Sequence, residues 1–364
     1  MDLSIIEKVK LHDAFWKREA MARPLLSFVV GGDRFPYDKM RASRALMQRN
    51  LTITADMVDV DAFVEQAEEE LAFRMDSAVP QDMLRGVAPF GGIPWMECLL
   101  GCGVMAMEHS FVSIPCQESP GDPGKLRLGE DNPWLQKYIE FLSKYQVRFG
   151  DKYPVTETLM RGCLDVYGAL IGQEEMVYAF YDEPDAAYAM LSRINELYVE
   201  MVKLTLKYSN KIAGGMLHPY GLWSPGTVNQ FQEDLAALLT PEQMEKFVIP
   251  LHNRMCAQFD INGMHTHPTS YHVMPQQLTV GRLNLVQAQK DEGDPPIFDR
   301  IGVLQSIQRA GKCLHYGSDL SGQEIDALLD ALEFRGLSLI LRVQSEAEAM
   351  DLYEHICKVC AEKK

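Results

Sequence analysis

The stretch GKCLHYGSDLSGQEIDALLDALEFRGLSLILRV, residues 311–343, contains two short apolar runs separated by a segment with helical spacing. The runs at 311–318 and 336–343 have the length of buried strands. Between them, SGQEIDALLDALEF places apolar residues at i, i+3 and i+4, which is typical of an amphipathic helix. Two strands joined by such a helix are typical of parallel βα units. This stretch therefore predicts an α/β fold with a parallel sheet.

The same alternation extends outward from this unit, most regularly after residue 150. The candidate strands are RPLLSFVV (23–30), LAFRMDSAVP (71–80), YPVTETL (153–159), AGGMLHPYG (213–221), INGMHTHP (261–268), RLNLVQA (282–288), GKCLHYGS (311–318) and GLSLILRV (336–343). Eight strands alternating with helices predict a (β/α)8 TIM barrel. We expect one barrel domain over 23–364, preceded by a helical segment at 1–22.

Two local signals mark helix boundaries within this pattern. Thr240 followed by Pro241 and Gln243 predicts a helix start with a capping box. A break between two helices is predicted at Glu183-Pro184, because a residue before proline is biased out of the helical region. The Pro- and Gly-rich stretch 110–137 has no period and is predicted to be a long excursion from the barrel and a candidate lid.

The overall charge limits the classes of partner. The net charge is −16 over 364 residues, with the acidic residues spread along the chain, so neither nucleic acid nor an anionic membrane is an expected partner. A polyanionic ligand would need a local cluster of arginines and lysines. No run approaches 18 apolar residues, the N-terminus does not resemble a signal peptide, and eight cysteines are scattered, so we expect a cytoplasmic protein that acts on a small molecule.

The candidate chemistry lies at the ends of the predicted strands, where barrels carry their active sites. His265 and His267 are two residues apart on one strand, so both side chains point to the same side, with Cα atoms roughly 6.5 to 7 Å apart. Two imidazoles placed in this way suit a zinc ion, which needs a third protein ligand in a catalytic site. The alternative interpretation is a pair of hydrogen-bonded residues that hold a polar substrate.

The third ligand is left open by the sequence. His272 lies five residues further on, past a proline, and Cys313 and His315 lie two strands away. The chain has no GxxxxGK[ST] loop, no GxGxxG turn and no GxSxG elbow, which disfavours nucleotide hydrolysis, dinucleotide binding and serine hydrolysis. It also has no DxHxxG segment, so any corrinoid would have to arrive on another protein.

One family resemblance covers most of the chain from about residue 23. WSPGTVNQFQEDLAALLTPEQMEKFVIPLHNRM (223–255), followed by INGMHTHP, RLNLVQAQ and AGKCLHYG, resembles the uroporphyrinogen decarboxylase superfamily. In that superfamily an acidic "ED" or "D" precedes a helix, which leads to a strand that ends in a His-containing motif. The resemblance implies a (β/α)8 barrel, in agreement with the strand count.

The decarboxylase branch of this superfamily fits the sequence less well. The resemblance implies an R-x-x-x-R element in the first loop, an aspartate after the second strand, a tyrosine and a late histidine. Arg34 stands alone in the first loop, Asp76 takes the place of the aspartate, and Arg342 stands where the late histidine is expected. A substrate with eight carboxylates also conflicts with the acidic chain. Classical uroporphyrinogen decarboxylation is therefore disfavoured.

The second branch comprises cobamide-dependent methyltransferases, which use a separate corrinoid protein. The resemblance implies zinc ligands of the H-x-C type with a later cysteine. His265 matches the histidine, His267 occupies the cysteine position, and residues 342–344 lack the later cysteine. These departures weaken thiol activation, but methyl transfer from a small methylated substrate to the corrinoid partner stays compatible with the sequence. In this hypothesis Tyr220, Trp223 and Gln287 shape the substrate pocket.

Two alternatives accompany the methyltransferase hypothesis. In a decarboxylase or lyase that acts on a small carboxylic acid, Arg34 and Arg342 would pair with carboxylates and Asp76 would stabilise a developing cation. Glu157 lies at another predicted strand end and is a further candidate for substrate binding. The third hypothesis is a barrel that binds a ligand without catalysis. The helix faces also leave open whether the chain forms a homodimer.

Overall fold

The computed structural model describes residues 3–31, 40–48, 50–75, 79–291 and 293–363. Its centre is a parallel sheet of seven strands. In spatial order these are β1 (Leu25–Val30), β12 (Leu337–Val343), β11 (Cys313–Ser318), β10 (Leu285–Gln289), β9 (Ile261–Thr266), β8 (Val228–Gln232) and β5 (Met160–Arg161). The predicted α/β fold with a parallel sheet is therefore confirmed.

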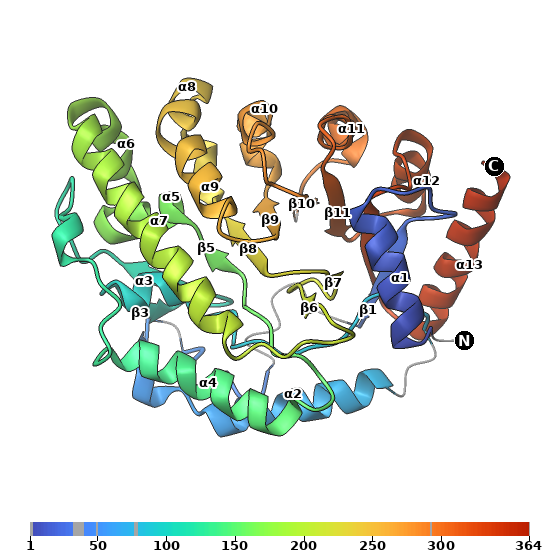
Figure 1. The fold of residues 1–364 in the computed structure, drawn as a ribbon, viewed down its shortest axis with the longest axis horizontal. Helices are drawn as coiled ribbons and strands as arrows, with labels where there is room; N and C mark the ends of the chain where they lie inside the picture. The colour runs from blue at the N-terminus through green and yellow to red at the C-terminus, as the bar shows by residue number, and fades with distance from the viewer. Residues whose placement is uncertain (1–2, 32–39, 49, 76–78, 292, 364) are drawn as a thin grey trace.

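Helices follow the strands along the chain. They are α1 (Ile5–Trp16), α2 (Val60–Met75), α3 (Trp95–Leu99), α4 (Pro133–Phe149), α5 (Cys163–Ile171), α6 (Gln173–Asp182), α7 (Pro184–Leu206), α8 (Pro241–Gln243), α9 (Ile249–Cys256), α10 (Met274–Gln277), α11 (Ile301–Arg309), α12 (Gly322–Ala331) and α13 (Glu346–Glu362). Figure 1 shows α7, α9, α10, α11 and α12 following one another along the sheet, while α2 and α4 run side by side away from them. Short 3-10 or π turns lie at 55–57, 123–125, 234–238, 244–248, 268–273 and 297–300.

Two small antiparallel elements accompany the central sheet. One is a sheet of β2 (Thr52–Ile53), β3 (Gly103–Ala106) and β4 (Phe111–Ile114), and the other is a hairpin of β6 (Met216–Leu217) and β7 (Trp223–Ser224). The stretch 110–137 contains β4, a 3-10 turn and the first turn of α4. Its role as a lid stays a prediction.

The local helix signals are confirmed. The Thr240 side chain accepts a hydrogen bond from the backbone of Gln243, whose side chain in turn accepts one from the Thr240 backbone. The predicted break lies at Glu183, which separates the end of α6 at Asp182 from the start of α7 at Pro184. The helix inside 311–343 starts at Ser321 with a second capping box that involves Glu324. These caps use backbone donors that would otherwise lack partners.

The strand predictions are right at five places and wrong at two. Strands predicted at 23–30, 261–268, 282–288, 311–318 and 336–343 correspond to β1, β9, β10, β11 and β12. The predicted strand 71–80 is wrong, because α2 continues to Met75 and residues 76–78 lie outside the described part of the chain. The predicted strand 213–221 is also wrong, because it contains only the short strand β6, which pairs antiparallel with β7 instead of joining the parallel sheet.

Two further differences concern the middle of the sheet. The segment predicted at 153–159 contributes only an isolated bridge at Val155, and the strand proper is β5. The sequence patterns do not predict strand β8, because VNQFQ has neither an apolar run nor a strict alternation, although its residues are nearly all buried. Its polar side chains face the interior of the fold, where a parallel strand ordinarily carries apolar ones.

Residues 82–87 lie between β1, at one edge of the seven-stranded sheet, and residues 154–156, which precede the other edge strand β5. Asp82 N donates to Leu26 O of β1 at 2.9 Å, and Val87 N donates to Pro154 O at 3.0 Å. Thr156 N in turn donates to Val87 O at 2.8 Å. These residues form no regular strand in the described structure. A closed barrel of eight strands therefore stays a prediction, with hydrogen bonds already present on both sides of the remaining gap.

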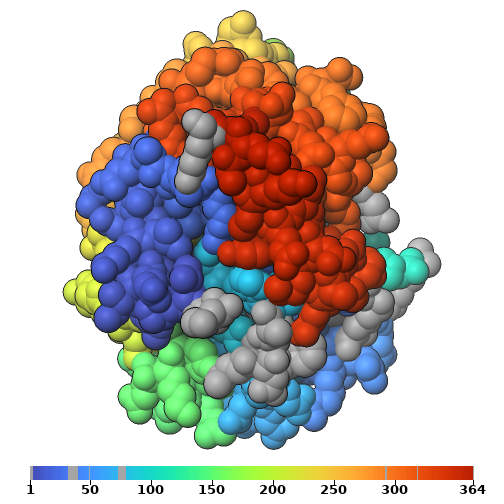
Figure 2. All heavy atoms as spheres, turned by 90° about the vertical axis from the view of Figure 1, so that its right-hand side faces the viewer, coloured from blue at the N-terminus to red at the C-terminus, as the bar shows by residue number. Residues whose placement is uncertain are grey.

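Helix α1 and the β6–β7 hairpin cover the end of the sheet where the strands begin. His12 is fully buried there; its Nε2 donates to Asp82 O at 3.0 Å and its Nδ1 accepts from Trp223 N at 2.7 Å. Burial lowers the pKa of His12 to about 4. Figure 2 shows the N-terminal part, in blue, beside α13, in dark red, where Arg23 lies over the ring of Tyr353.

Among the described residues, no helix combines the length and the apolar character needed to cross a membrane. The division of the chain into a helical segment at 1–22 and a barrel domain at 23–364 stays a prediction.

Candidate metal and substrate site

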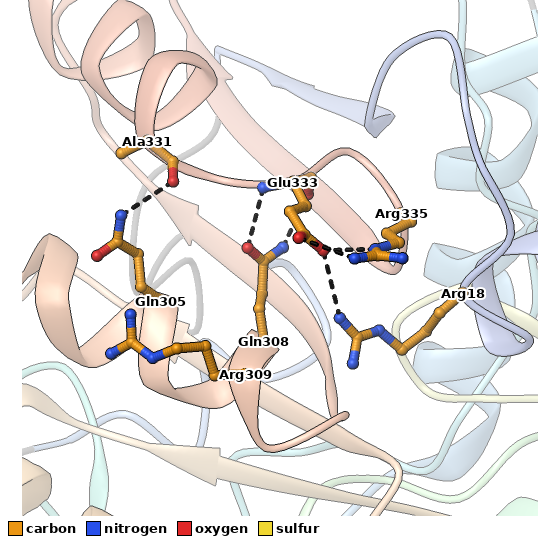
Figure 3. Close-up of a pocket in the computed structure, with 7 residues that line it drawn as sticks. All are labelled: Arg18, Gln305, Gln308, Arg309, Ala331, Glu333 and Arg335. Atoms are coloured by element: carbon orange, nitrogen blue, oxygen red, sulfur yellow. Dashed lines mark hydrogen bonds and ion pairs between the residues drawn. The ribbon is translucent and has the colours of Figure 1, made fainter.

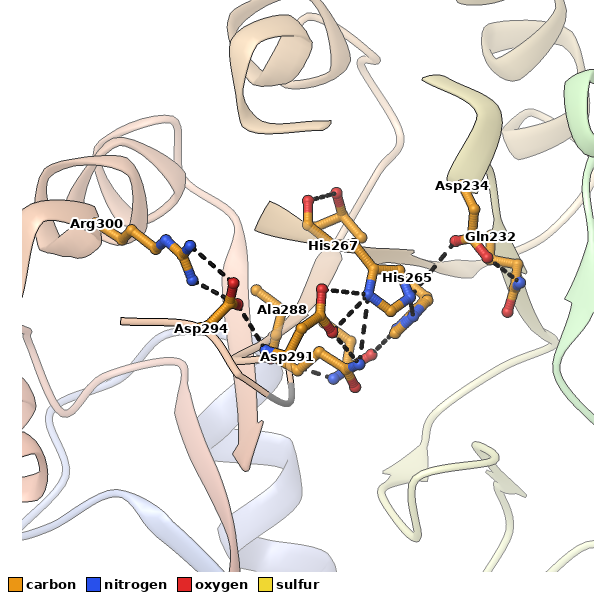
Figure 4. Close-up of polar contacts among 11 residues, drawn as sticks. Gln232, Asp234, His265, His267, Ala288, Asp291, Asp294 and Arg300 are labelled. Carbon is orange, nitrogen blue, oxygen red and sulfur yellow. Dashed lines mark hydrogen bonds and ion pairs between the residues drawn. The ribbon is translucent and has the colours of Figure 1, made fainter. Parts of the chain in front are cut away.

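The two histidines of the predicted pair converge at the end of β9. His265 lies in the strand and His267 directly after it, and their Nε2 atoms are 3.0 Å apart with the ring planes nearly perpendicular (Figure 4). His265 is 8% exposed, whereas 27% of the His267 side chain is exposed. The pair therefore lies at the boundary between the buried sheet and solvent, as the spacing of two residues predicts.

Gln287 of β10 determines which nitrogen of His265 carries hydrogen. Its Oε1 contacts His265 Nδ1 and also accepts a hydrogen bond from the Tyr220 hydroxyl at 3.2 Å. Its Nε2 donates to Ala288 O at 3.1 Å. Because Oε1 is a carbonyl oxygen that can only accept, His265 must donate from Nδ1. The lone pair on Nε2 is therefore free to bind a metal ion.

A carboxylate orients His267 in the same way. His267 Nδ1 lies 2.8 and 3.0 Å from the two carboxylate oxygens of Asp291, and Gln289 Nε2 donates to Asp291 Oδ1 at 3.0 Å. Asp294 accepts from Asp291 N at 2.8 Å and pairs with Arg300 (Figure 4). A carboxylate behind an imidazole is the usual partner of a metal-binding histidine. It leaves the Nε2 lone pair of His267 facing that of His265.

Asp234 is the third group at this place. Its Oδ1 lies 3.7 Å from His267 Nε2 and is buried without a hydrogen-bond partner among the described residues, whereas its Oδ2 accepts from Gln232 Nε2 at 2.8 Å. Ligand atoms of Asp234, His265 and His267 all lie within 4.8 Å of one another. Sequence reasoning missed Asp234, because it follows the unpredicted strand β8. The "ED" at 233–234 in the family resemblance was the signal that could have found it.

The three ligand atoms fit a zinc ion in a catalytic arrangement. Zinc–nitrogen and zinc–oxygen bonds of about 2.0 to 2.1 Å at tetrahedral angles place ligand atoms roughly 3.3 Å apart. The separations of 3.0 Å and 3.7 Å lie on either side of this value. Two imidazoles and a carboxylate leave a fourth position for substrate or water. Without a cation between them, two facing lone pairs and an orphaned carboxylate oxygen would be costly.

Asp234 is held in place by a reciprocal pair of buried carboxylates. Asp165 of α5 accepts hydrogen bonds from Asp234 N at 3.0 Å and Leu235 N at 2.8 Å. Glu233 accepts from Leu164 N at 3.0 Å and Asp165 N at 3.1 Å. The carboxylate of Asp165 thus binds backbone N–H groups beside Glu233, and the carboxylate of Glu233 binds backbone N–H groups at the start of α5. These reciprocal hydrogen bonds fix the backbone that carries Asp234. Burial raises the pKa of Asp165 well above its ordinary value, with further contributions from Asp234 and Glu233.

A second group of possible metal ligands lies beside the first. Cys163, Glu233 and His252 are all buried and offer ligand atoms within 4.8 Å of one another. Glu233 Oε1 lies 3.0 Å from His252 Nε2 and accepts a hydrogen bond from Cys163 Sγ at 3.7 Å. Burial raises the pKa of the Cys163 thiol well above its ordinary value, so the thiolate that a metal needs is disfavoured.

The surroundings of the histidine site favour the neutral form of the His265 ring and include the guanidinium of Arg161. Burial, followed by the neighbouring His267, lowers the pKa of His265, so its ring stays in the neutral form that binds metals. Arg161 ends β5 in register with Gln232. Burial lowers the pKa of Arg161, but the carboxylates of Glu97, Asp165 and Asp234 raise it above its ordinary value. Sequence reasoning did not select Arg161.

The other predicted pocket residues lie in different places. Tyr220 reaches the site through Gln287 and stacks on His315, with ring centroids 4.8 Å apart. The Trp223 indole donates to Ile212 O at 2.9 Å, and its place in the substrate pocket stays a prediction. Arg342 of β12 points toward Asp319, with Nη1 4.0 Å from the carboxylate.

Glu157 is buried, and neither of its carboxylate oxygens has a hydrogen-bond partner among the described residues. Burial raises its pKa well above the ordinary value, which favours a protonated acid inside the sheet. The residues Arg34 and Asp76 lie outside the described part of the chain.

None of the candidates for the third ligand joins the histidine pair. His272 contacts the backbone carbonyls of Thr269 and Leu239 at 3.2 and 2.9 Å. Cys313 Sγ donates to Phe15 O at 3.3 Å beneath the sheet. His315 Nδ1 lies 2.9 Å from Ser338 Oγ, and its pKa is lowered by burial to about 3. These three side chains are therefore structural in the described geometry.

Comparison with known proteins shows a shared fold with solved structures. The chain matches no family model and no curated protein sequence. It is similar to solved structures that include a methyltransferase from Methanosarcina mazei, with a TM-score of 0.62 and 12% sequence identity. The match covers 95% of this chain and 98% of that one. At this identity the likeness shows that the two chains share a fold over almost their whole length.

Proposed function

We propose that this protein is a methyltransferase that moves a methyl group between a small methylated substrate and a corrinoid carried by a separate protein. The observation that carries the proposal is the convergence of Asp234 Oδ1, His265 Nε2 and His267 Nε2 at one point, with the other nitrogen of each ring occupied. The fold shared with a solved methyltransferase supports it.

The bound metal in this proposal is zinc, held by Asp234, His265 and His267. Zinc would act as a Lewis acid on the heteroatom that carries or receives the methyl group. Gln287 and Asp291 hold the Nδ1 hydrogens, so both rings keep their Nε2 lone pairs directed at the metal. The guanidinium of Arg161, on the same edge of the sheet, supplies a charge that can orient an anionic group of the substrate.

The corrinoid partner would dock over this edge of the sheet. Leu238 follows Asp234 in the turn 234–238 and is 46% exposed, and Phe298 follows Asp294 in the turn 297–300 and is 49% exposed. Large exposed apolar side chains on both flanks of a polar site suit contact with another protein. We infer that these two residues belong to the docking surface.

The alternative proposal is a lyase that acts on a small carboxylic acid. Arg161 favours it, because its guanidinium pairs with Glu97 through Nη1 at 2.9 Å and has further donors that could bind a substrate carboxylate. In that case turnover would need no metal and would survive a strong chelator. The Arg161→Ala substitution would abolish this turnover.

The decisive experiment measures zinc content and methyl transfer together. We expect about one zinc per chain, loss of zinc in Asp234→Asn and His265→Ala, and retention in His272→Ala, a matched histidine control whose ring contacts only backbone carbonyls. Methyl transfer to cob(I)alamin, followed by its absorption spectrum, is measured with methylamines, methoxy compounds and methyl thiols. Full turnover by metal-free protein would exclude the zinc site.

A further inference from the structure

A cavity of about 540 Å³ lies at the end of the sheet opposite to the histidines (Figure 3). It is lined by Arg18, Gln305, Gln308, Arg309, Ala331, Glu333 and Arg335. These residues come from the segment after α1, from α11, from the last residue of α12 and from the loop before β12. Its volume is in the range of small-molecule binding sites. The cavity is therefore separate from the proposed catalytic site.

The lining is positively charged, although the chain carries a net charge of −16. Three arginines face one carboxylate, Glu333. Arg335 Nη2 donates to Glu333 Oε1 at 2.9 Å and so neutralises it, while Arg18 reaches the other oxygen only at 3.7 Å. Arg309 donates to the carbonyl of Gly302 at 3.5 Å. Two guanidinium charges at this cavity are thus in excess over the carboxylate that faces them.

The backbone places Arg18 in the cavity at a conformational cost. Arg18 follows α1 with φ +52°, a left-handed conformation that glycine or asparagine ordinarily supplies after a helix. Its side chain passes between two glycines: a Cβ atom at Gly336 would lie 3.0 Å from Arg18 Cγ, and one at Gly311 would lie 3.7 Å from Nη1. Arg18 Nε is buried and has no hydrogen-bond partner among the described residues.

The two glutamines of the lining already form hydrogen bonds with the backbone. The Gln308 amide exchanges hydrogen bonds with the backbone N and O of Glu333 at 3.0 and 2.8 Å. Gln305 Nε2 donates to Ala331 O at 3.1 Å. Among the described lining residues, the guanidinium donors that remain for a ligand are those of Arg18 and Arg309, with Nη1 of Arg335 beside them. Figure 3 shows Arg18 and Arg309 on either side of Gln308, on different segments of the chain.

We propose that this cavity binds a small molecule carrying at least two phosphate groups, held between Arg18 and Arg309. Guanidinium groups bind phosphate oxygens through paired hydrogen bonds, and two of them on different segments suit a ligand with two anionic groups. The ligand would join the segment after α1 to α11 and thereby stabilise the fold. The site is independent of the proposed methyl transfer.

Isothermal titration calorimetry and thermal unfolding with pyrophosphate test this proposal. We expect saturable binding of pyrophosphate, tighter than that of inorganic phosphate or citrate, and an increase in melting temperature on binding. Arg18→Ala and Arg309→Ala should each weaken binding by about tenfold or more. Arg309→Lys should recover only part of it, because lysine keeps the charge and loses the paired geometry.

Two control variants test whether pyrophosphate binds in this cavity rather than elsewhere on the protein. Arg254→Ala removes an equal charge from the outer face of α9 and should leave binding unchanged. Asp234→Asn, which removes the proposed zinc ligand, should also leave it unchanged, because only pyrophosphate bound through zinc would depend on Asp234. The proposal is overturned by absence of binding at millimolar pyrophosphate, by citrate binding as tightly, or by equal losses in Arg254→Ala and Arg309→Ala.

Discussion

Two neighbouring clusters in this protein contain the same kinds of side chain and differ in how their carboxylates are satisfied. Glu233, beside Cys163 and His252, has hydrogen-bond donors around both oxygens, including two backbone N–H groups. Asp234, the next residue, has one buried oxygen with no donor among the described residues and two imidazoles facing it. Adjacent positions in the chain therefore serve opposite purposes: one holds the backbone, and the other is left open for a cation.

The contrast between the two clusters shows why the types of side chain present are a weak guide to metal sites. Both groups meet the same distance criterion. The two clusters differ in what stabilises the negative charge of the carboxylate: hydrogen-bond donors at Glu233, and a bound cation in our proposal for Asp234. A buried carboxylate that already accepts several hydrogen bonds gains little from a metal. The open cluster also has the two outer partners, Gln287 and Asp291, that a zinc-binding histidine needs.

The strongest test replaces the carboxylate by an amide at each of the two adjacent positions, 233 and 234. Glu233→Gln should lower the free energy of unfolding by about 3 to 5 kcal/mol, because the donors around it lose a charged acceptor. Asp234→Asn should leave the metal-free protein as stable as before, or more stable, because the buried Oδ1 atom has no donor among the described residues and no longer carries charge. Urea unfolding of both variants, after chelator treatment, measures this difference. Equal destabilisation would end the distinction between the clusters.

Acid titration extends the comparison to histidines that have no open nitrogen. His12 has backbone partners at both nitrogens, and burial lowers its pKa to about 4. The unfolded chain binds a proton near pH 6.5 whereas the folded chain does not, so stability falls as the pH drops through this window and levels off near pH 4. We expect His12 to contribute a loss of about 2 kcal/mol between pH 7.5 and pH 5.

The measurement for His12 is the slope of unfolding free energy against pH. His12→Gln should flatten the slope, whatever its effect on the absolute stability. His355→Gln, at an exposed histidine on α13, should leave the slope unchanged. An unaltered slope in His12→Gln would mean that this ring does not titrate as its burial requires.

The outer partner of His267 is the next test. Asp291→Asn keeps the shape of the side chain but weakens the acceptor behind the imidazole, so zinc affinity should fall by about 10- to 100-fold. Competition with a chromogenic chelator measures the affinity. Asp299→Asn, in the same connecting segment, serves as the control and should retain wild-type affinity. Unchanged affinity in Asp291→Asn would show that the carboxylate does not support the ligand.

The sequence predicts the histidine pair because the period of a strand is enough to place His265 and His267 on one side. It does not reveal Asp234, because β8 is a parallel strand with buried polar residues, and such a strand lacks the apolar run that marks its neighbours. The turn of the β6–β7 hairpin directs the Tyr220 hydroxyl to Gln287 and the Trp223 indole to Ile212, a divergence that the sequence does not reveal. Turn geometry of this kind depends on tertiary packing.

The smallest expected effect concerns the hydroxyl of Tyr220. Burial raises the pKa of Tyr220, so the hydroxyl keeps its hydrogen and donates to Gln287 Oε1, the same atom that contacts His265 Nδ1. Tyr220→Phe removes one of two donors and should weaken zinc binding by about 1 kcal/mol, or roughly fivefold. Tyr271→Phe is the matched control, because the Tyr271 hydroxyl is buried without a hydrogen-bond partner in the described part of the chain. If both variants lose the same affinity, Tyr220 acts through packing alone rather than through Gln287.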